Sequence, residues 1–217
     1  RQDLSNEAFP FGTAKHIEVG YAHARAHRIS YVGELGWELY VPSEFARCIF
    51  DSIMEAGKAF DLKLAGTHAI DSLRSEKAYR HWGHDIGDED TPLEAGVGFA
   101  CKLNSDIDFI GKEALLAQKA KGLTRRLVSF KLEDSSPILY QNEPIFRGGI
   151  VVGQLTSGSY GHALGAAVGM GYVKNEKGVN AQWINDGRYQ IQIAGELYAA
   201  SASLAPFYDP KSLHVKV

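Results

Sequence analysis

The hydrophobic pattern changes after Gly122, and this change constrains the fold of the 217-residue chain more than any other feature. Before it, apolar residues recur at helical spacing in segments beginning near residues 43, 67 and 111. After it, between residues 125 and 204, short β-rich runs alternate with Gly, Asn and Pro turns. Several short strands at regular spacing predict a small antiparallel barrel or sandwich. We therefore expect two regions, with a boundary between residues 118 and 124.

The first region mixes expected strands and helices, and the helices carry capping signals. Ser43 can cap the first helix and Gly57 sits where its C-terminal cap belongs. Thr67 can cap the second helix, and a third is expected from Gly111 to about Lys121. The second helix is expected to pack through an apolar face: Ala69, Ile70 and Leu73.

Composition is that of an ordinary globular protein and excludes several classes of partner. The chain is 45% hydrophobic and 23% charged, with a net charge of −3 and no long basic run. Binding to nucleic acid or to an anionic membrane therefore has no electrostatic support, and no apolar run approaches the roughly 20 residues of a membrane span. Cys48 and Cys101 are isolated, which favours a reducing compartment: the cytoplasm, or the mitochondrial matrix in a eukaryote. Because the chain begins with Arg1 and a polar stretch, we expect it to be part of something longer.

Residues 31–38 (YVGELGWE) combine two β-rich runs with a glycine at each corner of a turn, Gly33 and Gly36. This pattern predicts a hairpin in which Tyr31 faces Glu38 across the ladder. Alternation then sorts the side chains onto two faces. The expected core face carries Val32, Trp37, Leu39 and Val41, and the other face carries Ile29, Tyr31, Glu38 and Tyr40.

The face with Tyr31 and Glu38 has two interpretations. A carboxylate can accept two parallel N–H bonds from a flat heterocycle, and a neighbouring aromatic ring can stack on that ring. The alternative is a solvent-facing hairpin edge with an ordinary glutamate. Spacing alone favours the alternative, because glutamates are mostly exposed.

A second candidate is the cluster of His81, His84 and Asp85, with His68 as a possible fourth metal ligand. Without defined helical placement or a nearby cysteine, this signal is weak. We expect instead that Trp82 packs and that the histidines are surface or hydrogen-bonding groups.

Two further segments invite catalytic interpretations. The acidic stretch 85–94 lacks the alternate spacing of a calcium loop, and sequence gives no carboxyl separation by which to judge a glycosidase pair, so a solvated loop is expected. Residues 156–162 (TSGSYGH) resemble a nucleophile region but lack the Gly-x-Ser-x-Gly elbow, so a glycine-permitted turn is expected.

Several separate motifs together resemble one known family, in the right order and over nearly the whole chain. They are residues 4–12 (LSNEAFPFG), 28–39 (RISYVGELGWEL), 71–77 (DSLRSEK), 91–96 (TPLEAG), 109–115 (FIGKEAL), 156–158 (TSG) and 169–173 (GMGYV). This set is similar to the glycine-cleavage T-protein-like, aminomethyltransferase-like region at the C-terminal end of FAD-dependent dimethylglycine and sarcosine dehydrogenases.

The resemblance implies a fold and a cofactor. It implies an α+β, ferredoxin-like region over residues 1–120 and a C-terminal antiparallel β-barrel over 121–217. It also implies a tetrahydrofolate site, in which Glu38 holds the pterin N–H edge and Tyr31 is the aromatic partner. The one-carbon unit released when the flavin oxidises an N-methyl amine is then captured as methylene-tetrahydrofolate. Expected partners are the folate and the parent protein's own flavin domain.

The same resemblance implies what this chain does not carry. The family's catalytic aspartate and the FAD domain fall upstream of Arg1, so no residue here is assigned a catalytic role and no metal is implied. We expect the isolated chain to be inactive. Ile70 stands where the aminomethyltransferases carry an arginine, which favours the dehydrogenase-fused branch. Two alternatives stay open: a non-catalytic module that braces a flavin oxidase, and a glycine-cleavage aminomethyltransferase with a lipoyl-protein partner.

Overall fold

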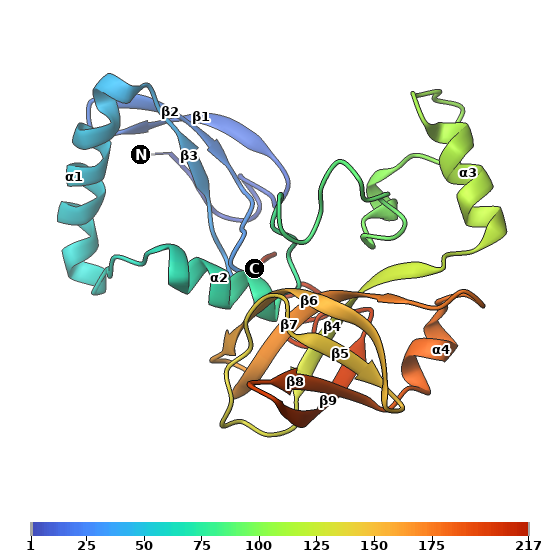
Figure 1. The fold of residues 1–217 in the computed structure, drawn as a ribbon. Coiled ribbons are helices and arrows are strands. Elements are labelled where there is room, and N and C mark those ends of the chain that lie inside the picture. Colours follow the sequence, from blue (N-terminus) through green and yellow to red (C-terminus); the bar gives the residue numbers. More distant parts are fainter. Residues whose placement is uncertain (1, 217) are drawn as a thin grey trace. The chain divides into compact units, whose positions relative to one another are not determined.

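The computed structural model describes residues 2–216 (Figure 1). Its strands and helices follow in the order β1 (Ala14–Val19), β2 (Ala22–His27), β3 (Glu38–Tyr40), α1 (Ala46–Gly57), α2 (Thr67–Glu76), α3 (Lys112–Lys121), β4 (Arg125–Leu132), β5 (Pro144–Arg147), β6 (Ile150–Gly161), β7 (Ala166–Lys174), α4 (Ala181–Asn185), β8 (Tyr189–Ile193) and β9 (Glu196–Ser203). Short 3₁₀ turns lie at Ser43–Phe45, Lys58–Phe60 and Gly98–Ala100.

Backbone contacts divide the chain into two units, which we call the sheet unit and the barrel unit. The sheet unit holds the residues up to 70 together with those from 211 onward, and the barrel unit is Asp71–Pro210. The barrel strands themselves begin at Arg125. The division expected near residue 120 stays a prediction.

The sheet unit is built on an antiparallel meander in the order β1-β2-β3. Along β2 every second residue is buried, at Ala22, Ala24 and Ala26, because successive side chains of a strand point to opposite faces. Ile49 of α1 packs into the same cluster, so helix α1 packs against the alanine face of β2. Trp37, Leu39 and Val41 also pack against this core, as predicted.

The hairpin itself lies elsewhere than predicted. The strand that pairs with β3 is β2, with His27 opposite Glu38 and Arg25 opposite Tyr40. Residues 29–37 form the irregular connection between them, so Tyr31 is in a loop and does not face Glu38 across a ladder. The predicted tight turn at Gly33 and Gly36 is wrong because those glycines shape the interior of a longer loop; Gly33 has a φ of 80°.

The helix-capping predictions are only partly met. The chain after Pro42 begins with a 3₁₀ turn, and Ser43 is its first residue rather than a side-chain cap. Helix α1 ends at Gly57, but Gly57 has a right-handed φ of −70°, and the left-handed residue that stops the helical path is Asp61. Thr67 is the first residue of α2.

Helix α2 is buried through polar side chains rather than through the apolar face predicted for it. Ser72, Ser75 and Glu76 are among its buried residues, whereas Ile70 is 39% exposed. Helix α3 forms over almost the predicted range and buries no residue. Among the helices within residues 2–216, none combines the length and the apolar composition that a membrane crossing needs.

The barrel unit contains a closed antiparallel barrel with strand order β4-β7-β6-β5-β8-β9 (Figure 1). Its interior is apolar, with Phe130, Leu155 and Ile191 completely buried. At Gly158 of β6 an added Cβ would lie 2.6 Å from the backbone of Tyr140, so the passing chain requires glycine there. The predicted α+β class with a small antiparallel barrel is confirmed. The short helix α4, whose first turn is capped by the side chain of Asn180, was not predicted.

Candidate functional site

A buried arginine shapes the loop that carries Tyr31. Arg28 directly follows β2 and is fully buried. Its guanidinium donates to the carbonyl of Gly36 at 3.2 Å and to Asn6 Oδ1 at 3.0 Å, and it lies 4.7 Å from the centre of the Trp37 ring. It also donates to the carbonyl of Val215 at 3.4 Å. Arg28 therefore ties both ends of the 29–37 loop to the sheet unit.

Glu38 begins β3, on the face of the sheet opposite the alanine core. Its carboxylate Oε2 accepts a hydrogen bond from the hydroxyl of Tyr40 at 2.7 Å. The two residues share a face because they are two positions apart on a strand, as alternation predicted. The Glu38 carboxylate, by accepting the phenolic hydrogen, raises the pKa of Tyr40. No donor among the residues that the structure describes is bonded to the other oxygen, Oε1.

His27 supports this pair from the neighbouring strand. Its ring lies 4.7 Å from the Tyr40 ring, centroid to centroid, with 41° between the planes. Register places His27 opposite Glu38, so all three side chains share one patch of the sheet. His27 Nε2 is buried and has no hydrogen-bond partner among residues 2–216. We call Glu38, Tyr40 and His27 the carboxylate patch.

The two site residues predicted from sequence, Tyr31 and Glu38, lie in different elements of the structure. Glu38 belongs to a strand and Tyr31 to the half-buried part of the loop that Arg28 fastens. Sequence reasoning missed Arg28 and His27. Tyr40 was placed correctly on the face of Glu38, but no role was given to it. The available signal for Arg28 was its position immediately before the glycine-cornered run.

The acidic stretch 85–94 is not the solvated loop that was predicted. Asp85 is fully buried and accepts from Arg74 Nη1 at 2.7 Å and from the backbone N–H of His81 at 2.9 Å. The hydroxyl of Thr156 donates to its second oxygen. Arg74 also donates to Ser157 Oγ at 2.9 Å. The stretch is therefore part of a buried polar network that joins α2 to β6 within the barrel unit.

A second ionic cluster extends this network. Arg125 of β4 pairs with Asp90 at 2.6 Å and lies 3.9 Å from Glu94. Its guanidinium stacks 3.5 Å from the centre of the Tyr172 ring, and the Tyr172 hydroxyl donates to the carbonyl of Asp85 at 3.0 Å. Burial, reinforced by the negative charge of Asp90, raises the pKa of Tyr172. Asp88 and Glu89 remain exposed, so only part of the stretch fits the prediction.

The histidine-rich segment gives no metal geometry. Within residues 2–216, no group of three or more His, Cys, Asp and Glu side chains is arranged to hold a metal. His81 and His84 stack on each other with ring centres 4.5 Å apart, while Asp85 is committed to Arg74. Trp82 is 70% exposed, so the prediction that it packs is wrong.

The nucleophile-like segment 156–162 is part of a strand and not the turn that was predicted. Residues 156–161 lie within β6, paired with β7. The hydroxyl of Thr156 donates to Asp85, and the hydroxyl oxygen of Ser157 accepts from Arg74. Their part is therefore structural, because they satisfy buried charges.

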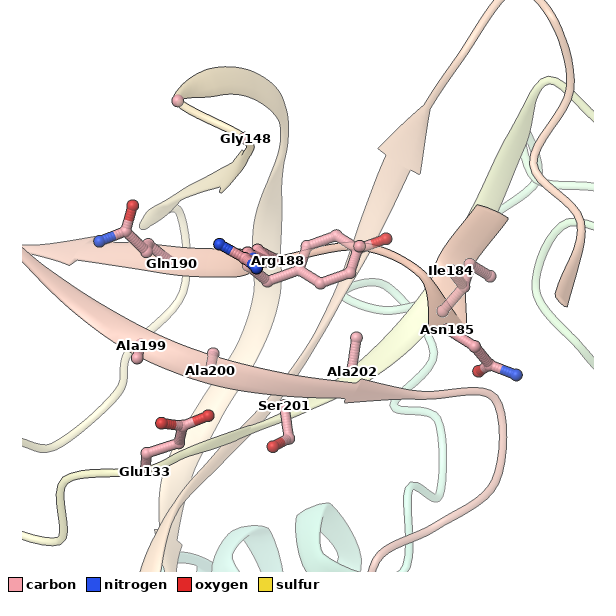
Figure 2. Close-up of a pocket in the computed structure, with 13 residues that line it drawn as sticks. Glu133, Gly148, Ile184, Asn185, Arg188, Gln190, Ala199, Ala200, Ser201 and Ala202 are labelled. Atoms are coloured by element: carbon pink, nitrogen blue, oxygen red, sulfur yellow. The ribbon is translucent and has the colours of Figure 1, made fainter. Parts of the chain in front are cut away.

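A cavity of about 630 Å³ lies in the barrel unit beside β8, β9 and α4 (Figure 2). Arg188 directly precedes β8 and Gln190 lies within it, Ala199–Ala202 lie along β9, and Ile184 and Asn185 lie at one end (Figure 2). Glu133 and Ser201 also line the cavity. None of the residues predicted as site residues lines this cavity.

The two polar regions differ in chemical capacity. In the barrel network each carboxylate of the Arg74 and Arg125 clusters faces a guanidinium, so little acceptor capacity is left for a ligand. The carboxylate patch offers an oxygen on a half-buried side chain of the sheet, beside aromatic rings. Such an arrangement accepts N–H donors of a planar ring.

The sequence matches two domains of one family in chain order. Residues 1–105 match the GCVT N-terminal domain, and residues 125–209 match the glycine cleavage T-protein C-terminal barrel domain. The second match coincides with the barrel strands β4–β9.

Curated relatives and one solved structure agree with these matches. Human mitochondrial sarcosine dehydrogenase is 44% identical over 99% of this chain, which spans 23% of that protein. The 4-methylaminobutanoate oxidase (formaldehyde-forming) of Paenarthrobacter nicotinovorans is 42% identical over 97% of this chain, which spans 25% of it. The glycine cleavage system aminomethyltransferase T of Bartonella henselae superimposes with a TM-score of 0.80 at 25% identity, covering 95% of this chain and 55% of that one. The chain thus spans about a quarter of these two curated relatives, and it belongs to the glycine cleavage T-protein family, as the sequence motifs indicated.

Proposed function

We propose that this chain is the tetrahydrofolate-binding part of an FAD-dependent N-methyl amine dehydrogenase of the dimethylglycine or sarcosine type. In this proposal, Glu38 binds the N–H edge of the pterin and Tyr31 packs against its ring. The observation that carries it is the Glu38 carboxylate, held by Tyr40 through one oxygen, with its other oxygen bonded to no donor among the described residues.

The donor chemistry of the patch fits such a ligand. A 2-amino-pyrimidinone edge presents N–H groups side by side, and a carboxylate accepts them in parallel. Tetrahydrofolate supplies nitrogen nucleophiles that accept a one-carbon unit at the oxidation level of formaldehyde, which gives methylene-tetrahydrofolate and water. The chain's own residues bind and orient the pterin. Glu38 accepts hydrogen bonds from the edge of the ring, and Arg28 fixes the loop that carries Tyr31.

The oxidative half of the reaction belongs, in this proposal, to other parts of the parent protein. FAD bound there would supply the two-electron oxidation of the N-methyl amine, and the one-carbon unit would leave at the oxidation level of formaldehyde. The names of the two curated relatives, a dehydrogenase and a formaldehyde-forming oxidase, support this division. We propose no catalytic residue in this chain, expect no turnover from it alone, and place the parent in the cytoplasm or, in a eukaryote, the mitochondrial matrix.

The test is calorimetric titration of the full-length parent with tetrahydrofolate, in the wild type and in Glu38→Gln. A hydrogen bond to a charged group contributes about 1.5–3 kcal/mol, so the substitution is expected to weaken binding about 10- to 100-fold. The matched control is Glu18→Gln, because Glu18 is an exposed glutamate on β1 of the same sheet. Absence of binding by the wild type, or equal binding by Glu38→Gln, contradicts the proposal.

A second readout follows the product. With an N-methyl amine and tetrahydrofolate, the wild type is expected to yield methylene-tetrahydrofolate. Glu38→Gln is expected to oxidise the amine at an unchanged rate and to release free formaldehyde instead. A parallel fall in amine oxidation would show that Glu38 serves the flavin site or the fold rather than the folate.

A second candidate function is a non-catalytic module that braces a flavin enzyme. The observation that favours it is Ile70, an aliphatic, 39% exposed side chain where the resemblance expects an arginine. Ile70→Arg separates the two candidate functions. If the chain has a working folate site that lacks one contact, the variant is expected to bind folate more tightly than the wild type. If the chain is a non-catalytic module, neither the wild type nor the variant is expected to bind folate.

A further inference from the structure

The Glu38 carboxylate is held by a neighbouring side chain of its own strand. A carboxylate at the surface of a sheet ordinarily samples several rotamers. A ligand that fixes one rotamer therefore binds at a cost in side-chain conformational entropy. Here the hydroxyl of Tyr40 donates to Oε2 at 2.7 Å. That bond restricts the rotamers of the carboxylate before any ligand arrives.

Tyr40 is itself held in place, although 54% of it is exposed. Its ring lies against the His27 ring at 4.7 Å, and Arg25 is its register partner on β2. The groups that face the phenol are therefore Glu38, Arg25 and His27, of which Glu38 raises the pKa of Tyr40 and Arg25 lowers it. The His27 contact restrains the Tyr40 ring from the neighbouring strand.

We propose that Tyr40 is a positioning residue for Glu38, which presents the carboxylate to a ligand with two adjacent N–H donors. This inference rests on the proposed folate site. Each carboxylate oxygen accepts two hydrogen bonds, so Oε2 can accept from Tyr40 and from the ligand at once, while Oε1 accepts the second N–H. The phenol fixes the plane in which both ligand bonds form.

The barrel unit contains a matched pair that serves as a control. Tyr198 of β9 donates to Glu196 Oε2 at 2.9 Å, with the same spacing of two residues along a strand. The hydrogen bond to Glu196 likewise raises the pKa of Tyr198. Tyr198→Phe therefore removes the same interaction at a place that the proposed folate site does not use.

The experiment measures tetrahydrofolate binding to the full-length parent as wild type, Tyr40→Phe, Glu38→Gln, the double variant and Tyr198→Phe. Tyr40→Phe is expected to weaken binding about fivefold, as loss of one hydrogen bond implies, with an unchanged melting temperature. In the Glu38→Gln background, Tyr40→Phe is expected to change nothing further, because the two residues act as one unit. Tyr198→Phe is expected to bind as the wild type does.

The outcomes separate this inference from the folate assignment. Equal binding by wild type and Tyr40→Phe, with binding lost in Glu38→Gln, overturns the positioning role alone. Additive losses in the double variant overturn it too, because independent contributions are not positioning. Equal binding by Glu38→Gln overturns the proposed function itself.

A ligand-independent measurement keeps the inference testable in every case. In protein labelled with ζ-¹³C tyrosine, Glu38→Gln is expected to lower the pKa of Tyr40 toward that of a free phenol and to leave Tyr198 unchanged. An unaltered Tyr40 titration means that the bond to Glu38 does not persist in solution, and it overturns the proposal.

Discussion

The carboxylate patch of the sheet unit and the Arg74–Asp85 network of the barrel unit contain similar groups. They differ in how many hydrogen-bond donors within the protein each carboxylate binds. Asp85 is fully buried and receives a guanidinium, a backbone N–H and a hydroxyl. Glu38 is half-buried, receives one phenol and keeps an oxygen that no described residue occupies. A carboxylate whose acceptor sites are taken inside the protein holds the fold together, and one with a site left over is available to a ligand.

The sharpest way to break this comparison is to remove the buried carboxylate. Asp85→Asn removes the fully buried partner of Arg74 and leaves that guanidinium only the partly exposed Asp71, at 3.3 Å, which is expected to lower the free energy of unfolding by about 3–5 kcal/mol. Urea denaturation measures the change. Asp88→Asn, at an exposed aspartate three residues on, is the control and is expected to be neutral. Similar stabilities for the two variants would contradict a structural role for Asp85.

Arg28 tests whether the sheet unit has a buried, hydrogen-bonded anchor of its own. Arg28→Met removes the bonds to the Gly36 carbonyl and to Asn6, and it is expected to cost about 2–3 kcal/mol. Because these bonds fasten the 29–37 loop, limited proteolysis is expected to cut that loop faster. The control is Arg47→Met, whose ion pair with Asp51 is solvent-exposed, with an expected change below about 0.5 kcal/mol. An uncut loop in Arg28→Met would contradict the anchoring role.

Tyr172 makes the barrel network sensitive to alkaline pH. Burial raises its pKa in the folded protein, so above pH ~10 the unfolded chain binds fewer protons than the folded one. Stability is therefore fully present below pH ~10 and falls as pH rises through and beyond the unfolded pKa. Tyr172→Phe is expected to cost about 1 kcal/mol at pH 7 and to flatten that alkaline fall in chemical denaturation series. An equally steep fall in the variant would assign it to another group.

Glu38→Gln is expected to have the smallest effect on the fold and, in our proposal, the largest on ligand binding. Its unfolding free energy should stay within about 0.5 kcal/mol of the wild type, as for other surface substitutions. Thermal denaturation beside the calorimetric titration checks both quantities on one sample. Substantial destabilisation would place Glu38 in the same class as Asp85 and remove the contrast between the two units.

Local pattern was enough to predict a small antiparallel barrel or sandwich and the apolar side of β3, and the family resemblance then favoured the barrel. Alternation correctly placed Trp37, Leu39 and Val41 on the core and Glu38 with Tyr40 on the opposite face. It failed on the pairing partner, because the glycine-cornered run imitates a hairpin while β3 actually pairs with β2 across a longer loop. Strand pairing depends on which strand lies alongside, and spacing within one segment does not contain that information.

The buried polar network could not be read from sequence for a related reason. Helix α2 carries Ala69, Ile70 and Leu73, which predict an apolar buried face, yet its buried residues are Ser72, Arg74, Ser75 and Glu76. The partners of Ser72 and Glu76 are distant in sequence: the carbonyl of Tyr160 accepts from Ser72, and the backbone N–H groups of Ala163 and Leu164 donate to Glu76. Burial of polar groups is favourable only when such partners exist, and the fold alone supplies them.

The bond from Arg28 to the carbonyl of Val215 has a consequence for how the protein is made. The two groups are separated by 187 positions in sequence, and the whole barrel unit is inserted between them. During synthesis on a ribosome, most of the sheet unit emerges before the barrel unit but lacks this partner until the chain has grown past residue 215. The barrel unit, contiguous from residue 71 to 210, can complete itself earlier. Of these two units, the one whose translation starts earlier is therefore the one that is completed later.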